Sequence, residues 1–138
     1  MRHEITCSWT GDMAFEAEVS GHRIKLDAEA SVGGKDAGPR PKPLVLVALA
    51  GCSGMDVVSI LKKMREPLTW FDVKVFGDLV EEHPKYYSSI KIVYEFKASD
   101  NLKDENVRKA VTLSQEKYCG VNALLRMAVP VEWEIVYR

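Results

Sequence analysis

The sequence feature that most constrains the fold is a long, nearly continuous apolar segment from Leu44 to Leu61. Only Ser53, Asp56 and Ser59 interrupt it with polar side chains. A membrane span needs about 20 predominantly apolar residues, and a carboxylate near its centre is costly. The segment therefore favours a buried helix of a water-soluble protein over a transmembrane helix.

This segment has the end signals of a helix. Pro43 suits the first turn, where its missing N–H costs little, and Glu66-Pro67 ends the pattern because the residue before a proline disfavours helical geometry. We predict a helix from Pro43 to about Arg65, roughly 35 Å long at about 1.5 Å per residue. Because it is apolar nearly all round, we expect a sheet to cover one side and a second subunit the other.

The residues before this helix predict a small sheet and a loop. Residues 5–26 contain strand-length runs separated by Thr10-Gly11-Asp12 and Ser20-Gly21, a pattern typical of an antiparallel meander. Residues 31–43 hold three glycines and three prolines and predict an irregular loop. A loop of this length in a compact domain is usually functional or disordered, and its prolines stiffen it against disorder.

The residues after the helix predict a hairpin. Trp70–Leu79 and Tyr86–Lys97 alternate apolar and polar side chains around a turn at Glu81–Pro84. Domains of about 100–150 residues are the commonest, so a chain of this length has room for one core. We therefore expect a single α+β domain over residues 1–138, with antiparallel sheets packed around a long buried helix.

The C-terminal third predicts two helices and a closing strand. Asp104 is placed to cap a helix from Glu105 onward. Tyr118-Cys119-Gly120 interrupts this helix, and residues 121–127 suit a second, shorter one. Residues 129–137 have the composition of a strand.

Composition excludes several classes of function. The chain has 19 Lys and Arg against 20 Asp and Glu, so nothing indicates a nucleic acid or an anionic membrane as partner. Its first residues lack the apolar run of a secretory signal, which predicts a cytoplasmic protein with reduced thiols. The three cysteines form no CxxC pair, and His3, His22 and His83 are scattered, so we predict neither a metal nor a cofactor.

Cys52 is the first candidate for chemistry. Gly51 and Gly54 bracket it inside the predicted helix, although each glycine costs about 1 kcal/mol there relative to alanine. The missing side chains leave room for another backbone or a substrate to approach the thiol. The alternative is tight helix packing around an inert buried cysteine, which is a common environment for free cysteine.

Cys119 is the second candidate. It lies at the predicted junction between two helices, where a residue can move without disrupting a sheet, and a resolving thiol has to move. Lys117 is a nearby cation in sequence. The alternative is again a structural cysteine. Cys7, on a predicted strand, has no partner suggested by the sequence, and we expect it to serve packing.

The chain resembles the OsmC/Ohr family of hydroperoxide reductases over essentially its whole length. The resemblance rests on four motifs, Gly38-Pro39-Arg40-Pro41, Leu44 through Cys52, Met55 through Lys63, and Glu116-Lys117-Tyr118-Cys119. It implies an intertwined homodimer with two long helices packed centrally. It also implies thiol-dependent reduction of organic hydroperoxides, with a dithiol such as a lipoylated protein as the reductant in the Ohr branch.

The same resemblance assigns roles to both thiols. Cys52 matches the peroxidatic cysteine, which attacks the hydroperoxide as a thiolate and becomes a sulfenic acid. Cys119 matches the resolving cysteine, which condenses with that sulfenic acid to form a disulfide. Two other functions fit the same pattern, a binding protein that has lost peroxidase activity and a redox sensor that forms the disulfide without turnover.

The sequence departs from the family pattern in the charges around Cys52. The family places a glutamate just before the helix, where this chain has Lys42-Pro43, and the early arginine of the Ohr branch is also absent. Arg40 or Lys42 is the replacement we predict for the cation that lowers the pKa of Cys52; alternatively, Arg40 pairs with a surface carboxylate. Asp56, four residues after Cys52 on the same helical face, would raise the thiol pKa and suppress its reactivity if it were unpaired. It must therefore turn aside, cap a neighbouring element or hold a cation, and we predict a structural hydrogen-bonding role rather than a catalytic one.

Overall fold

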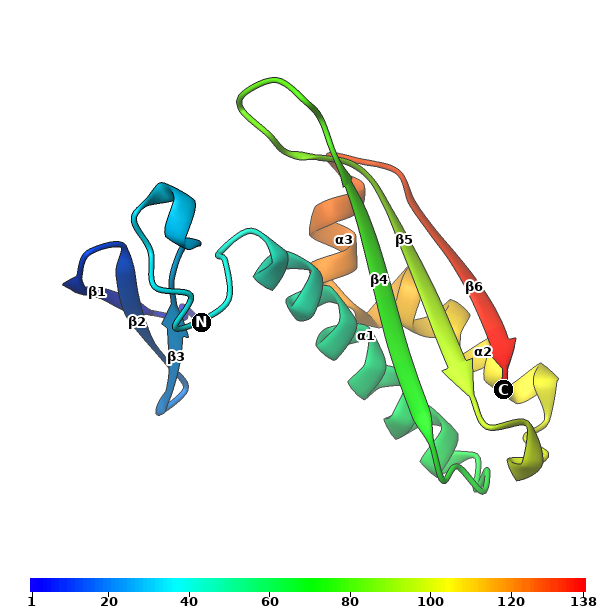
Figure 1. The fold of residues 1–138 in the computed structure, drawn as a ribbon. Coiled ribbons are helices and arrows are strands. Elements are labelled where there is room, and N and C mark those ends of the chain that lie inside the picture. The colour runs from blue at the N-terminus through cyan, green and yellow to red at the C-terminus, as the bar shows by residue number, and fades with distance from the viewer. The chain divides into compact units, whose positions relative to one another are not determined.

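The computed structural model describes residues 1–138 (Figure 1). The chain forms two compact units, Met1–Val45 and Leu46–Arg138. The first unit is an antiparallel sheet in the order β1-β2-β3. Its strands are β1 (Thr6–Gly11), β2 (Ala14–Val19) and β3 (His22–Leu26). The predicted meander is confirmed.

The turn between β2 and β3 shows why the sequence forms this hairpin. Val19 pairs with His22, so the loop consists of Ser20 and Gly21 alone. Both residues have positive φ, 51° and 78°. A two-residue loop with both φ values positive matches the right-handed twist of the flanking strands.

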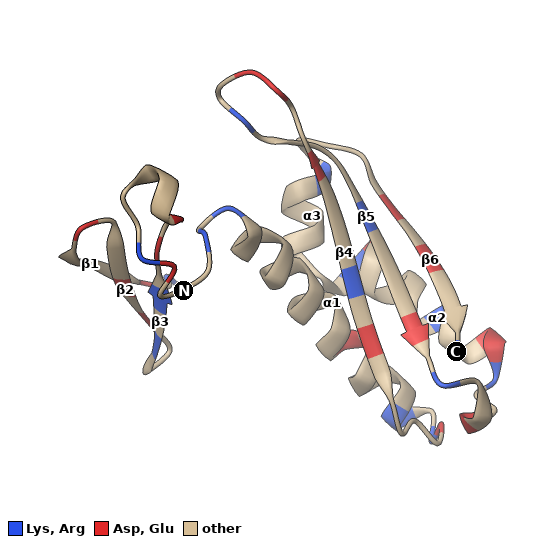
Figure 2. Cartoon of the chain, in the orientation of Figure 1, with Lys and Arg blue, Asp and Glu red and all other residues tan.

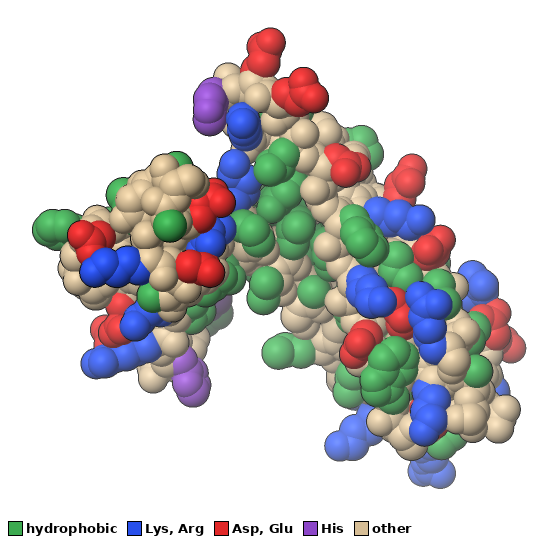
Figure 3. Space-filling view, viewed as in Figure 1, with side chains coloured by type: hydrophobic (Ala, Val, Ile, Leu, Met, Phe, Trp, Pro, Cys, Tyr) green, Lys and Arg blue, Asp and Glu red, His purple; other side chains and the backbone are tan.

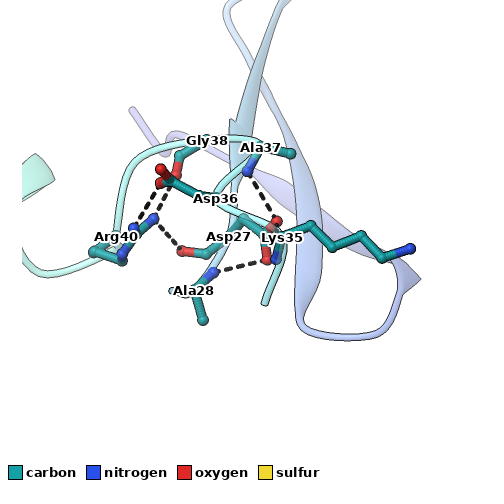
Figure 4. A network of polar contacts seen from close by, with 7 residues as sticks. All are labelled: Asp27, Ala28, Lys35, Asp36, Ala37, Gly38 and Arg40. Atoms are coloured by element: carbon teal, nitrogen blue, oxygen red, sulfur yellow. Dashed lines mark hydrogen bonds and ion pairs between the residues drawn. The ribbon is translucent and has the colours of Figure 1, made fainter. Parts of the chain in front are cut away.

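The loop after β3 is irregular except for one turn of 3₁₀ helix at Ala30–Val32. A buried carboxylate, that of Asp27, closes it (Figure 4). It accepts hydrogen bonds from the backbone N–H groups of Ala28, Lys35 and Ala37 at 2.7, 3.1 and 3.1 Å. These bonds, led by that of Ala37, lower the pKa of Asp27. The loop is thus ordered around one ionised side chain.

The second unit packs helices on one face of a three-stranded sheet (Figure 1). Helix α1 (Pro43–Lys63) begins just before this unit and ends within two residues of the predicted boundary. The strands, in the order β4-β5-β6, are β4 (Phe71–Leu79), β5 (Tyr87–Phe96) and β6 (Val131–Tyr137). The predicted β4–β5 hairpin is confirmed, and β6 adds to β5 in parallel, which the alternation pattern did not reveal.

The core of this unit lies between the sheet and the helices. Alternate residues of β5 point into it, as the sequence pattern predicted, and they meet α1 and helix α2 (Asp104–Leu113). Fully or almost fully buried side chains include Leu49, Val57 and Leu61 of α1, Ile90, Ile92, Tyr94 and Phe96 of β5, and Val107, Ala110 and Val111 of α2.

Within the second unit, α1 is covered on one side only. Val47, Met55 and Val58 on its other side are 60, 76 and 42% exposed, and Figure 3 shows hydrophobic side chains on the surface around the helix. The helix is long and apolar enough to cross a membrane, with a mean hydropathy of 2.1, a property that core helices of soluble proteins share. Cover by a second subunit stays a prediction.

Two local predictions are wrong. Asp104 does not cap α2; the N-cap is Lys103, and the Asp104 carboxylate accepts hydrogen bonds from Arg108 at 2.7 Å and from the Tyr137 hydroxyl at 2.6 Å. These two partners hold the side chain away from the orphan N–H groups of the first turn. Cys7 does not serve packing in this chain, because it is exposed on β1, an edge strand of its sheet.

Charged residues occur along the strands of the second sheet (Figure 2), and several of them, Lys74, Lys91, Glu95, Glu134 and Arg138, line one shallow hollow. Glu95 is the buried one among them, with its side chain 3% exposed. It lies 2.6 Å from Arg138 and 2.8 Å from Lys74. The hydrogen bond from Arg138, followed by that from Lys74, lowers its pKa from 4.5 to about 2.

We predict that Glu95 contributes to acid stability. A carboxyl with a depressed native pKa stabilises the fold above its unfolded pKa, and this stabilisation is lost as the pH falls from about 4.5 to about 2. Glu95→Gln should therefore be less stable than the wild type at pH 7, with the difference shrinking below pH 4. Urea unfolding across this range measures it. Glu134→Gln, which removes the half-exposed partner of Lys91, should change little.

Candidate functional site

Cys52 lies near the middle of α1 and is half-buried. The two glycines beside it have different surroundings. A Cβ atom at Gly54 would lie 3.4 Å from Val73 of β4, so this glycine permits close approach of helix and sheet, whereas a Cβ atom at Gly51 would meet nothing. Both line a groove of about 520 Å³ between α1 and β4, together with Met55, Val58, Phe71 and Val73 among others. The glycines thus leave open apolar surface next to the thiol-bearing turn.

Cys119 occupies the junction that the sequence indicated. One turn of π helix (Ser114–Tyr118) follows α2, and Cys119 is the N-cap of helix α3 (Gly120–Arg126). Its Sγ atom accepts a hydrogen bond from the backbone N–H of Asn122 at 3.4 Å. Its own N–H donates to the Ser114 carbonyl oxygen at 2.9 Å. The thiol is buried, with the residue 3% exposed.

The structure brings Cys52 and Cys119 together. Burial is the main reason why the pKa of Cys119 rises from 9.0 to about 11, and the neighbouring Cys52 thiol and the Asp56 carboxylate raise it further. The N–H of Asn122 acts in the opposite direction. Both cysteines are free thiols. Near neutral pH, Cys119 is therefore a protonated thiol beside a more accessible one.

We predict that alkylation of the native protein separates the three thiols. Iodoacetamide reacts with accessible thiolates, so buried Cys119 should be labelled last of the three at pH 7.5, after both exposed Cys7 and half-buried Cys52. Labelling of Cys119 should increase as the pH rises from about 9 toward 11, and peptide mass spectrometry after short pulses measures it. Equal labelling of Cys119 and Cys7 at pH 7.5 would contradict this assignment.

A chain of buried hydroxyl groups lies beside the thiol pair, joining Asp56, Ser53 and Ser114 to Tyr94. The Asp56 carboxylate accepts from the Ser114 hydroxyl at 2.9 Å, and the Ser114 and Ser53 hydroxyls lie 2.8 Å apart. Ser53 in turn lies 2.6 Å from the Tyr94 hydroxyl. Desolvation raises the pKa of Tyr94. The predicted hydrogen-bonding role of Asp56 agrees with this geometry, and Asp56 forms no ion pair within residues 1–138.

The chain continues through two buried side-chain amides. Gln115 Nε2 donates to the Tyr94 hydroxyl at 2.6 Å. Asn122 Nδ2 donates to the Gln115 carbonyl and Oε1, both at 2.9 Å, while Asn122 Oδ1 has no partner. Sequence reasoning did not assign these residues a role. The one available signal was Ser53, a polar residue inside an apolar helix.

Arg40, the predicted activating cation, is held by its own loop (Figure 4). Its guanidinium donates to Asp36 Oδ1 at 2.6 Å and to the carbonyl oxygens of Gly38 and Asp27 at 2.8 and 3.5 Å. Pairing with a surface carboxylate, the alternative drawn from the sequence, is therefore present. Lys42 is exposed. Activation of Cys52 by either cation stays a prediction.

The fold and the thiol pair define a class of protein, an α+β protein with two neighbouring cysteines, one on its long central helix. The family model for OsmC-like proteins matches residues 33–134. The chain belongs to this family.

Individual relatives agree with this assignment. Protein YhfA of Escherichia coli K12 is 38% identical over 131 residues, which cover 93% of this chain and 94% of the relative. The crystal structure of a hypothetical protein from Aquifex aeolicus is similar with a TM-score of 0.82 and 29% identity, covering 100% of this chain and 98% of the other. An organic hydroperoxide resistance protein OsmC from Legionella pneumophila has a TM-score of 0.71 at 13% identity, covering 100 and 98%. The last likeness concerns the fold alone.

Proposed function

We propose that this protein is a thiol-dependent peroxidase that reduces organic hydroperoxides, with Cys52 as the peroxidatic and Cys119 as the resolving cysteine. The observation that carries the proposal is that the half-buried thiol of Cys52 on α1 lies next to the buried, protonated thiol of Cys119 at the start of α3. The family assignment supports a role in peroxide resistance. The Legionella structure with this fold bears the name of an organic hydroperoxide resistance protein.

The reaction divides into two balanced steps. The Cys52 thiol ionises, and its thiolate attacks the distal oxygen of the hydroperoxide. The O–O bond breaks, and the leaving alkoxide takes up from solvent the equivalent of the proton that Cys52 released, which gives an alcohol. Cys52 is then a sulfenic acid. Cys119 attacks its sulfur, the S–O bond breaks, and the Cys119 proton leaves with the hydroxide as water. An external dithiol then reduces the disulfide by exchange and is itself oxidised.

The environments of the two thiols suit this order. Cys52 is more exposed than Cys119, so a hydroperoxide reaches it first. Cys119 has a pKa of about 11 and stays protonated near neutral pH, so it does not compete for the peroxide. The same proton is the one that the departing hydroxide needs in the second step.

The proposal includes a homodimer in the cytoplasm. A second copy would cover the exposed apolar side of α1, where Val47 and Met55 are more than half exposed. Such cover satisfies the expectation that a helix apolar nearly all round is enclosed by protein. An apolar pocket at that interface would favour organic or lipid-like hydroperoxides over hydrogen peroxide. A dithiol, such as one carried by a lipoylated protein, is the reductant we propose.

Intact mass and free-thiol counts test the proposal directly. The reduced protein, given a slight excess of cumene hydroperoxide, should lose two thiols and 2 Da, and dihydrolipoamide should reverse the change repeatedly. Cys52→Ser should not react, and Cys119→Ser should stop at the sulfenic acid. Unreacted wild-type thiols would remove the peroxidase proposal and favour a binding protein. One oxidation without turnover under several reductants would favour a redox sensor.

A matched set of variants tests the activating role of Arg40. If its guanidinium lowers the pKa of Cys52 by one unit or more, Arg40→Ala should slow the oxidation of Cys52 about tenfold or more. The reason is that one pKa unit, about 1.4 kcal/mol, corresponds to about a tenfold change in the fraction of reactive thiolate. Arg40→Lys should recover part of the rate. Asp36→Ala, which removes the carboxylate partner and keeps the arginine, should not slow the reaction. An unchanged rate in Arg40→Ala would discard Arg40 and leave Lys42 to be tested.

A further inference from the structure

Ser114 makes two contacts that join the elements carrying the two thiols. Its hydroxyl lies 2.8 Å from that of Ser53, the residue directly after Cys52 on α1. Its carbonyl oxygen accepts the N–H of Cys119 at 2.9 Å. The residue is completely buried. One side chain and one backbone group of the same residue thus connect the Cys52 turn to the Cys119 turn.

We propose that Ser114 is a positioning residue, which holds Cys119 opposite Cys52 for disulfide formation and is itself fixed by its hydrogen bonds to Ser53 and Asp56. This inference rests on the proposed function and assigns a role within the same site. It concerns the second step, the condensation of Cys119 with the Cys52 sulfenic acid.

The donors and acceptors at the two ends of the hydroxyl chain fix its direction. An ionised Asp56 carboxylate only accepts hydrogen bonds, and Gln115 Nε2 only donates them. The Ser114 hydroxyl donates to Asp56, so it accepts from Ser53. Ser53 in turn accepts from Tyr94, whose oxygen receives the Gln115 N–H. Each hydroxyl therefore has one orientation, and hydrogen bonds arranged head to tail strengthen one another.

The π turn makes the direction of Cys119 depend on the position of Ser114. Residues 114–118 form a π helix, so the N–H of Cys119 reaches back five residues to Ser114 rather than four. One extra residue in a helical turn rotates all that follows by about 100° about the axis. The direction in which Cys119 starts α3 thus depends on the placement of Ser114. Such single π turns in helices are frequent at functional sites.

Disulfide formation is sensitive to this placement. The attacking sulfur has to approach the sulfenic sulfur along one line, and effective concentrations fall steeply when reacting groups lose their fixed orientation. A Ser114→Ala variant keeps the backbone carbonyl but releases it from Ser53 and Asp56. We expect the second step to slow about 10- to 100-fold, since a misplacement of about 1 Å can cost about 100-fold in rate, while the oxidation of Cys52 proceeds as in the wild type.

Competition with dimedone separates the two steps. Dimedone traps the sulfenic acid, so after cumene hydroperoxide the ratio of dimedone adduct to disulfide reports how fast Cys119 reacts. The wild type should give mainly disulfide and Ser114→Ala mainly adduct. Ser88→Ala removes an exposed β5 hydroxyl that donates to the Asp78 carbonyl, and it should match the wild type. Equal ratios in Ser114→Ala and Ser88→Ala would overturn the proposal.

Two substitutions of Asp56 distinguish positioning from a pure effect of charge. Asp56→Asn keeps an oxygen that accepts from Ser114 and removes the charge, so positioning predicts a ratio close to that of the wild type. Asp56→Ala removes the acceptor and should shift the ratio toward the adduct. A role of the charge alone predicts that both variants behave alike, which would contradict the proposal. Asp56 is only half-buried, so both variants remain informative if Ser114→Ala folds poorly.

A measurement without peroxide keeps this inference separate from the proposed function. In glutathione buffers, the fraction of Cys52–Cys119 disulfide gives the effective concentration of one thiol for the other. This effective concentration should fall about tenfold or more in Ser114→Ala and Asp56→Ala, but not in Asp56→Asn or Ser88→Ala. If the wild type ignores cumene hydroperoxide but shows this pattern, the peroxidase proposal fails and the positioning role stands. If peroxide turnover occurs and the four variants have the same effective concentration, the positioning role fails alone.

Discussion

The requirement that a buried hydroxyl be hydrogen-bonded governs the centre of the second unit. Ser53 is completely buried in the middle of an apolar helix, and an unpaired polar group there would cost several kcal/mol by transfer estimates, or about 1–3 kcal/mol by protein mutational data. Its partners, Tyr94 and Ser114, come from a strand and from the end of a helix 41 and 61 residues away in sequence. One polar side chain on α1 therefore sets where β5 and the π turn meet the helix. The hydrophobic core covers one side of α1, but this hydroxyl specifies the register of the helix against the rest of the unit.

The two thiols lie together beside that hydrogen-bonded chain, and Asp56 at one end of it is among the groups that set the pKa of Cys119. Asp56 brings a negative charge to the pair and helps to keep Cys119 protonated. No positive side chain is among the groups that set the pKa of Cys119, and the N–H of Asn122 offsets only part of the effect of burial. A protonated thiol in such surroundings is a poor nucleophile toward a peroxide, which suits the resolving role that we propose for Cys119. In the proposed reaction, burial and charge rather than residue identity distinguish the two cysteines.

The sequence predicted the features that depend on local pattern. The apolar segment gave α1 to within two residues, alternation gave β4 and β5, and the Ser20-Gly21 turn gave the hairpin between β2 and β3. These predictions succeeded because hydrophobic period and turn chemistry are properties of neighbouring residues. The parallel pairing of β6 with β5 depends on a connection through two helices and leaves no trace in local alternation. Asp104 failed as a cap because Tyr137, thirty-three residues later, binds its carboxylate.

The candidate site shows the same division between local pattern and long-range contact. Both cysteines were recognisable from sequence, but Ser114, Tyr94 and Gln115 were not, because serine and glutamine near a helix end are ordinary surface residues until the fold buries them. The π turn adds a further difficulty, since it has no composition of its own and depends on a favourable contact to offset its poorer backbone geometry. Here the hydroxyl chain provides that contact. Asp56 had suggested a conflict with the thiol, and its charge does raise the pKa of Cys119. The structure gives the same carboxylate a second role, because it is the acceptor that orients every hydroxyl in the chain.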